Sequence, residues 1–307
     1  MKLPPLGRSQ WLRGGIGLAL AAVLIVVVER WLGWGKLLAP WRSLGPAELA
    51  GALLLVLGTH GLRALRFRRF FAAAREAGIV HALQLVLRHN FFNNLLPMRS
   101  GEISFPLLAR QTYGIGVGHA VGGLLLFRLL DLHTIAWLGS AALYWTTRSP
   151  GWLAAALVLL PLPLAGHALA RRWRSLPERL SGRLRDWLAP VFAAVPESRG
   201  PFVEAWAWTV ATWVGKLAVF AWLLTRFGHL GFGLGWLGAT AGDLTSVLPI
   251  HGWAGAGTYE AGVVAVLSPF GIDAAAALAM AVNLHLFILG TTVIGGLIAM
   301  AIPSRQL

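Results

Sequence analysis

The sequence predicts an all-α integral membrane protein with about six spanning helices and two re-entrant broken-helix hairpins arranged as an inverted repeat. Three observations lead to this prediction. Of the 307 residues, 57% are hydrophobic and only 12% are charged, whereas a soluble domain carries roughly 25% charged residues. Several apolar stretches reach the length of about 20 residues that a spanning helix needs. Two further apolar stretches are longer, and each is broken midway by proline and glycine.

Six stretches are long and apolar enough to cross a bilayer as single helices. In chain order they are Trp11–Val28, Ala47–Leu65, His119–Thr146, Trp152–Leu169, Phe202–Phe227 and Ala274–Ile302. No small-residue cleavage site follows the first stretch, so we interpret it as a retained helix and not as a signal peptide. We expect residues 1–307 to form a single transmembrane domain.

Residues 81–114 and 233–270 are the two broken stretches. Each half of either stretch is too short to cross the membrane at a rise of about 1.5 Å per residue. Irregular backbone at membrane depth is tolerated only where protein or water covers it. We therefore expect each stretch to form a hairpin that enters the membrane and returns to the side it left.

The basic residues indicate the orientation. With the N-terminus in the cytoplasm, seventeen lysines and arginines fall in cytoplasmic segments and five in outside segments. This asymmetry follows the positive-inside rule and requires both hairpins to return. We therefore expect a multi-pass protein of the bacterial inner membrane with both termini in the cytoplasm. The net charge of +14 is explained by this asymmetry, so we expect no nucleic-acid partner.

The two halves of this topology have the same order of elements. Two spans, a hairpin and a third span make up approximately residues 11–148, and the same series makes up approximately residues 150–303. The hairpin tips, "LLPMRSGE" and "VLPIHGWAGAGTYE", each contain Leu-Pro, glycine and then glutamate. Because the hairpins enter from opposite sides, the halves would be related by inversion. Paired broken helices in inverted halves point to a transport site near the membrane midplane.

Ionisable side chains inside the membrane cost about 2.5–3.5 kcal/mol each, so they need partners or a water-filled cavity. Arg128 and Asp131 share one helix face, and they form either a structural ion pair between a span and a hairpin or part of the site itself. The second half-helices are expected to begin at Ser100 and Thr258, where free N–H groups suit a phosphate or a carboxylate. The candidate substrate-binding residues are Asn93, Pro97, Arg99, Gly101, Glu102, Arg128, Asp131, Lys216, Asp243, Pro249, Gly255, Gly257 and Glu260.

Several kinds of chemistry have no signature in the sequence. There is no cysteine, and the histidines lack metal-binding spacing. No P-loop, nucleophile elbow or dinucleotide-binding fingerprint occurs, so we expect no cofactor, no metal, no ATPase and no enzymatic activity. Two amphipathic stretches, 63–76 and 171–199, mix arginine with aromatic residues and leucine. We expect them to contact anionic lipid at the cytoplasmic surface.

Three segments carry a family resemblance. They are "RALRFRRF" after the second span, "NNLLPMRSGEISFPLLAR" followed by "LLLFRLLDL", and "LTSVLPIHGWAGAGTYEAGV" near the end. Together they resemble the lysylphosphatidylglycerol synthase transmembrane-region family, also called the flippase-like domain family, over about residues 47–302. The resemblance implies a membrane domain that translocates lipid, with a second copy or a separate lipid-modifying enzyme as protein partner. Family members that synthesise the aminoacyl lipid carry a soluble acyltransferase domain, whereas this chain stops at Leu307, so we do not expect synthase activity.

We therefore expect a flippase that moves a lipid with a polar headgroup, anionic or aminoacylated, between the leaflets of the inner membrane. Arg99 and Arg128 would attract the lipid phosphate. Glu102, Asp131 and Glu260 would position these arginines or exchange a proton. Two alternatives stay open, namely an ion-coupled transporter of a small soluble anion and a membrane-embedded transferase that acts on a lipid-linked substrate.

Overall fold

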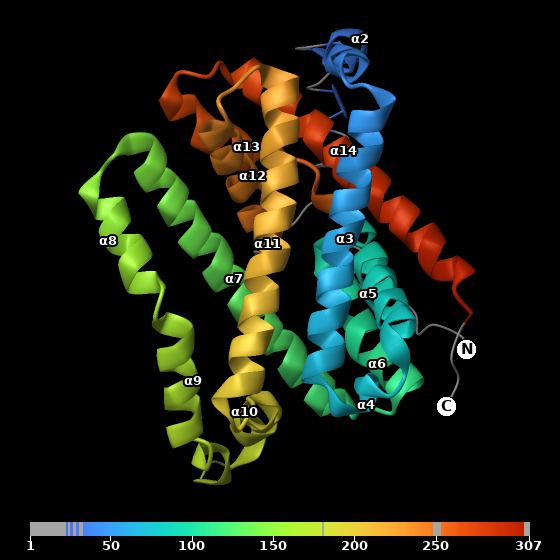
Figure 1. Ribbon diagram of the computed structural model, residues 1–307, viewed down its shortest axis with the longest axis vertical. Coiled ribbons are helices and arrows are strands. Elements are labelled where there is room, and N and C mark those ends of the chain that lie inside the picture. Colours follow the sequence, from blue (N-terminus) through green and yellow to red (C-terminus); the bar gives the residue numbers. More distant parts are fainter. Residues whose placement is uncertain are drawn as a thin grey trace.

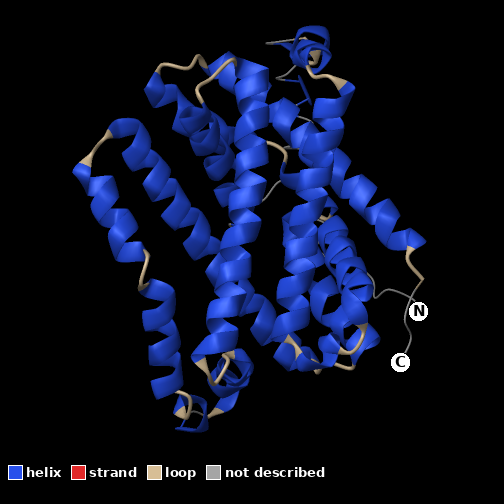
Figure 2. Cartoon of the chain, in the orientation of Figure 1, coloured by secondary structure: helices blue, strands red, loops and turns tan. Residues whose placement is uncertain are grey.

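The computed structural model describes residues 23, 25–26, 29–30, 33–179, 181–247 and 253–303. All secondary structure in this part of the chain is helical (Figure 2). In chain order, with 3₁₀-helices written η, the elements are α2 (Trp34–Leu37), η1 (Ala39–Ser43), α3 (Pro46–Phe70), α4 (Ala72–Arg75), α5 (Gly78–Leu95), η2 (Pro97–Ile103), α6 (Ser104–Tyr113), α7 (Val117–Thr147), α8 (Pro150–Leu159), α9 (Leu162–Arg172), η3 (Leu176–Arg179), α10 (Gly182–Ala194), α11 (Arg199–Gly228), α12 (Phe232–Val247), η4 (Trp253–Gly255), α13 (Thr258–Leu267), η5 (Ser268–Phe270) and α14 (Ala274–Ala301).

Five helical segments are long and apolar enough to cross a membrane: α3, α7, α8 together with α9, α11 and α14. They coincide with the second to sixth predicted spans, so the prediction of an all-helical membrane protein is confirmed. The first predicted span, Trp11–Val28, lies largely outside the described residues. α8 and α9 form one segment with an interruption around Pro161, because proline has no N–H to donate and its ring clashes with the preceding turn.

Residues 78–113 form two helices with a break between them. α5 ends at Leu95 because Pro97 restricts the preceding residue, Leu96, to an extended conformation with ψ 141°. η2 then turns the chain, and α6 runs in the opposite direction until Gly114, whose φ of 65° ends the helix. The α-helical part begins at Ser104 and not at Ser100 as the sequence predicted, because the first turns after the break are 3₁₀.

The second broken stretch has the same order of elements. α12 ends at Val247, residues 248–252 lie outside the described part, and α13 begins at Thr258, as predicted. In Figure 1, α5 and α6 lie toward one end of the molecule and α12 and α13 toward the other. η2 and η4, which follow the breaks of the two stretches, contact each other. Entry of the two hairpins into the membrane and the inverted relation of the halves stay predictions.

Two large apolar clusters contribute most to the packing of the helices. The larger packs α11, α12, α13 and α14 around side chains such as Phe220 and Leu284. The smaller packs α3, α5, α6 and the start of α7 around Phe67, Phe71 and Phe105. The aromatic rings of the smaller cluster pack closely, since the ring centroid of Phe67 lies 5.1 Å from that of Phe71 and 5.7 Å from that of Phe105.

Candidate functional site

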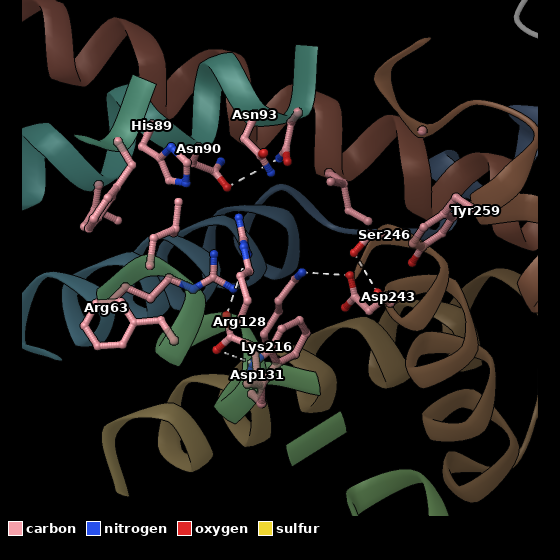
Figure 3. Close-up of a pocket in the computed structure, with 18 of the residues that line it drawn as sticks. Arg63, His89, Asn90, Asn93, Arg128, Asp131, Lys216, Asp243, Ser246 and Tyr259 are labelled. Carbon is pink, nitrogen blue, oxygen red and sulfur yellow. Dashed lines mark hydrogen bonds and ion pairs between the residues drawn. The ribbon is translucent and has the colours of Figure 1, made fainter. Parts of the chain in front are cut away.

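A polar cavity of about 120 Å³ lies between the two apolar clusters (Figure 3). Its walls come from α3, α5, α6, α7, α11, α12, η4, α13 and α14. Figure 3 shows Arg63, Arg128 and Lys216 on one side of this space and Asn90 and Asn93 of α5 on the other. The polar side chains in its lining are Arg63, Arg66, His89, Asn90, Asn93, Asn94, Arg128, Asp131, Lys216, Asp243, Ser246, Tyr259 and His285.

Asp131 is the centre of an ion-pair network. Its Oδ1 accepts a hydrogen bond of 2.8 Å from Arg66 Nη1 and another of 3.0 Å from Trp213 Nε1. Its Oδ2 lies 3.7 Å from Arg128 Nη1, and Arg128 Nε lies 3.1 Å from Glu102 Oε1. The network therefore joins α3, α7, α11 and η2. Arg66 and Asp131 are almost fully buried, with side-chain exposures of 7% and 4%.

Arg128 therefore has both of the roles that the sequence left open, namely an ion pair between a span and a hairpin and a place in the site itself. Its ion pair with Glu102 links α7 to the tip of the first hairpin, and its side chain lines the cavity. Both partners are more accessible than the Arg66–Asp131 pair, with side-chain exposures of 21% for Arg128 and 31% for Glu102. The Arg128–Glu102 pair is thus the part of the network that a ligand can reach.

Lys216 and Asp243 form a second pair, which joins α11 to α12. The Lys216 Nζ lies 2.8 Å from Asp243 Oδ1 and sits over the rings of Trp213 and Phe220. The other carboxylate oxygen of Asp243 and the hydroxyl of Tyr259 are buried without a hydrogen-bond partner among the described residues. Buried polar atoms of this kind need water or a ligand.

Arg63 differs from the other cations of the cavity. It has no ion pair and no hydrogen bond in the described part of the chain, and its guanidinium lies over the Trp213 ring, 5.6 Å from the ring centroid. Its Nε is buried and unsatisfied. The described lining contains four cationic side chains and two carboxylates, and Glu102 adds a third at the edge. The cavity is therefore net positive and suited to an anion.

The structure brings most of the predicted site residues together. Glu102 contacts Arg128, and Gly101 packs against the end of α5. Pro249 lies outside the described residues, and of Pro97 and Arg99 only the backbone, in η2, is described. The predicted residues that line the cavity are Asn93, Arg128, Asp131, Lys216, Asp243 and Gly255.

Glu260 and Gly257 lie beside the cavity and are not part of its lining. Glu260 is 2% exposed, and its Oε2 accepts a hydrogen bond of 2.7 Å from the N–H of Gly257. Gly257 has a φ of 86°, a conformation in which a side chain would be strained. The other oxygen of Glu260 bonds to His285 of α14. These hydrogen bonds therefore fix the start of α13 next to the cavity, outside its lining.

The sequence analysis missed Arg63 and Arg66. The prediction counted both as cytoplasmic, Arg66 because it follows the predicted end of the second span at Leu65 and Arg63 because it lies within two residues of that end. α3 continues to Phe70, and both arginines lie inside it. The signal was present, because Phe67 and Phe70 extend the apolar pattern past the arginines. Removing the two from the count leaves fifteen cytoplasmic basic residues against five, so the predicted orientation keeps its basis.

Gly101 provides a test of the packing at the first hairpin tip. A Cβ at this position would lie 2.2 Å from the carbonyl oxygen of Phe92, which belongs to the backbone of α5 and cannot turn aside. We expect Gly101→Ala to destabilise the protein by about 1–3 kcal/mol through overpacking. Thermal unfolding in detergent measures this. Gly58→Ala in α3 is the matched control, since nothing lies within 4 Å of a Cβ there. Equal unfolding temperatures for the two variants would contradict the packing described.

Comparison with known proteins gives one match. The family described as lysylphosphatidylglycerol synthase TM region matches residues 15–296. No curated protein and no solved structure matches the chain. Within the described residues, no group of three or more side chains of histidine, aspartate or glutamate is placed to hold a metal ion.

Proposed function

Because the chain belongs to the lysylphosphatidylglycerol synthase TM region family and its interior cavity is net positive, we propose that the protein moves a membrane lipid with a phosphate-bearing anionic headgroup between the leaflets of the bacterial inner membrane. The five apolar helical segments place the cavity inside a membrane protein. A charged headgroup needs such a polar path, because its transfer through hydrocarbon alone is very costly.

The observation that carries the proposal is Arg63, which has no ion pair among the described residues and lines the same cavity as Arg128. A guanidinium presents donors in a planar fork that matches phosphate oxygens, and hydrogen bonds between charged partners are shorter and stronger than neutral ones. Arg63 has no internal carboxylate to satisfy it among the described residues. A phosphate between these two guanidinium groups would supply the missing acceptor.

Glu102 marks the position at which a headgroup would enter the cavity. It holds Arg128 at 3.1 Å and is partly exposed. A phosphate that approaches Arg128 would replace this carboxylate and so release η2 from α7. Binding would thereby loosen the first hairpin tip at the moment when the headgroup must pass it.

The cavity volume limits what passes through the interior. At about 120 Å³ the cavity is much smaller than a phospholipid, so the acyl chains would stay in the bilayer. A small soluble anion would satisfy the same charges, which makes it the second candidate function. Lipid transport and soluble-anion transport are distinguished by the substrate that the protein moves.

The test is lipid translocation in proteoliposomes. Purified protein is reconstituted with trace nitrobenzoxadiazole-labelled phosphatidylglycerol or with a labelled glycosyl diacylglycerol, which has no phosphate, and dithionite quenching follows their exchange. We expect faster exchange of the phosphate lipid than in empty vesicles and than of the neutral glycolipid. Arg148→Gln, at the far end of α7, is the control and should exchange lipid like the wild type. No exchange of either lipid, together with uptake of inorganic phosphate, would replace this proposal by soluble-anion transport.

A further inference from the structure

The buried pair Glu260 and His285 lies behind the second hairpin tip. His285 Nδ1 lies 2.6 Å from Glu260 Oε1, and its Nε2 lies 2.7 Å from the carbonyl oxygen of Ala254. The second oxygen of Glu260 accepts the N–H of Gly257. Both ring nitrogens of one histidine therefore face acceptor groups in a largely buried site, where Glu260 is 2% and His285 6% exposed.

The number of protons in this arrangement follows from the chemistry of the partners. A carbonyl oxygen only accepts, so Nε2 must donate to Ala254. A neutral imidazole has only one N–H, so Nδ1 then has a lone pair that faces Glu260. A carboxylate at 2.6 Å would repel this lone pair. The contact is stable only when one additional proton lies between Nδ1 and Oε1, on the imidazole or on the carboxyl.

We infer that Glu260 and His285 form a proton-binding site, and that the bound proton holds the second hairpin tip against the headgroup cavity. Binding converts a carboxylate and a neutral imidazole to a pair with one more proton and no net charge. Release returns that proton to water and leaves one buried negative charge, which is costly without a partner. The transport part of this inference rests on the proposed function, whereas the presence of the proton does not.

The charges around the pair favour this assignment. α12 contributes Asp243, which is already paired with Lys216 of α11 at 2.8 Å. α13 contributes Tyr259, a neutral phenol whose ring lies 5.0 Å from the ring of His285. α5 contributes His89, which bonds to Ser104 and lies across the cavity from Tyr259 in Figure 3. Within the described residues, no cation is paired with Glu260 in place of His285.

The pair is connected to the cavity through the backbone. Ala254 accepts the bond from His285 and also lines the cavity. Its φ of 51° is a left-handed conformation that is unfavourable for alanine, so contacts such as this hydrogen bond must hold it there. After loss of the proton the neutral imidazole has one N–H for two acceptors, and the charged carboxylate of Glu260 is the stronger acceptor. The N–H then stays on Nδ1, so the bond to Ala254, and with it the support of η4, is lost. The proton thus controls the shape of the wall that a headgroup touches.

Glu260→Gln tests the site because it imitates the protonated state. The amide N–H₂ can donate to Nδ1 while the amide oxygen accepts from Gly257, so every hydrogen bond is kept but no proton can leave. Glu48→Gln is the matched control. Glu48 also accepts a helix N-terminal N–H, that of Gly45 at 2.8 Å, but its second partner is Arg226 and not a histidine.

Two readouts distinguish failure of this inference from failure of the proposed function. The first is the unfolding temperature in detergent as the pH is raised. A proton that is bound more tightly in the folded state stabilises at low pH, so stability must fall as the pH rises and the proton leaves. We expect this fall in the wild type and in Glu48→Gln, and a clearly smaller fall in Glu260→Gln. His285→Gln, which also removes the shared proton, should give the same reduced dependence.

The second readout is lipid exchange at several pH values. The wild-type rate should change with pH, by up to about tenfold per pH unit for a single proton. Glu260→Gln should exchange lipid at every pH as the wild type does at low pH. Identical pH profiles of stability for Glu260→Gln and Glu48→Gln would overturn the inference, even if lipid exchange were observed. If stability depended on the proton but no lipid were exchanged, the assignment of the proton site would stand and only its link to transport would be lost.

Discussion

Asp131→Ala is expected to destabilise the protein by about 3–5 kcal/mol, because it leaves Arg66 buried without its counter-charge. Asp131 accepts hydrogen bonds from Arg66 and Trp213 and lies near Arg128. Three helices and the first hairpin tip are joined through this one carboxylate. The expected result is a large fall in the unfolding temperature in detergent.

The chain offers a matched control for this variant. Arg69 and Glu204 also pair α3 with α11, at 3.5 Å, but their side chains are 62% and 41% exposed. An exposed pair contributes about 0–1 kcal/mol, so Glu204→Ala should unfold close to the wild-type temperature. If both alanine variants lost the same stability, burial of the Arg66–Asp131 pair would not be the reason, and the network described here would be wrong.

The second large effect is expected on transport and not on folding. Arg63→Gln should slow exchange of the phosphate lipid by about 10- to 100-fold, since a hydrogen bond to a charged group contributes about 1.5–3 kcal/mol. Arg63 has no ion pair to lose in the described structure, so the unfolding temperature should stay near that of the wild type. Dithionite quenching in proteoliposomes measures the rate.

Two further variants make this prediction specific. Arg69→Gln, six residues further along the same helix and exposed, should exchange lipid normally. Arg63→Lys restores the charge without the planar fork and should recover part of the rate. A well-folded Arg63→Gln protein that moves lipid at the wild-type rate would show that the unpaired guanidinium does not bind the headgroup.

Much of the fold was predictable because it depends on local patterns. Apolar runs of sufficient length located five of the spans, and Pro97 located the end of α5 through its direct effect on Leu96. Finer boundaries were less predictable. The 3₁₀ turns of η2 moved the start of α6 from Ser100 to Ser104, because the tip packs closely against the backbone of α5 and not because of any capping residue.

The candidate site was predictable only in part, because its partners are far apart in sequence. Single positions such as Arg128 and Asp243 stand out in apolar stretches. The ion pairs and hydrogen bonds between such residues do not stand out in the sequence, since Arg66 and Asp131 are 65 residues apart and His285 and Glu260 are 25 apart. The sequence predicted that Glu260 would position the arginines or exchange a proton, whereas the structure pairs it with His285 and leaves it outside the cavity lining. Helix packing, which brings such pairs together, is not encoded in the spacing of any one segment.

The partial exposure of the Arg128–Glu102 pair has a consequence for turnover. A carboxylate attached to the protein competes with every headgroup for the same guanidinium, at an effective concentration fixed by the fold. The apparent affinity for lipid is then the intrinsic affinity reduced by the fraction of time that Arg128 is unoccupied. In a membrane, where lipid is abundant, this weakening costs little occupancy. The Glu102 carboxylate can also take the place of each departing headgroup at Arg128. A protein that is saturated with lipid should therefore release its lipid quickly, and a site that bound lipid more tightly would slow transport.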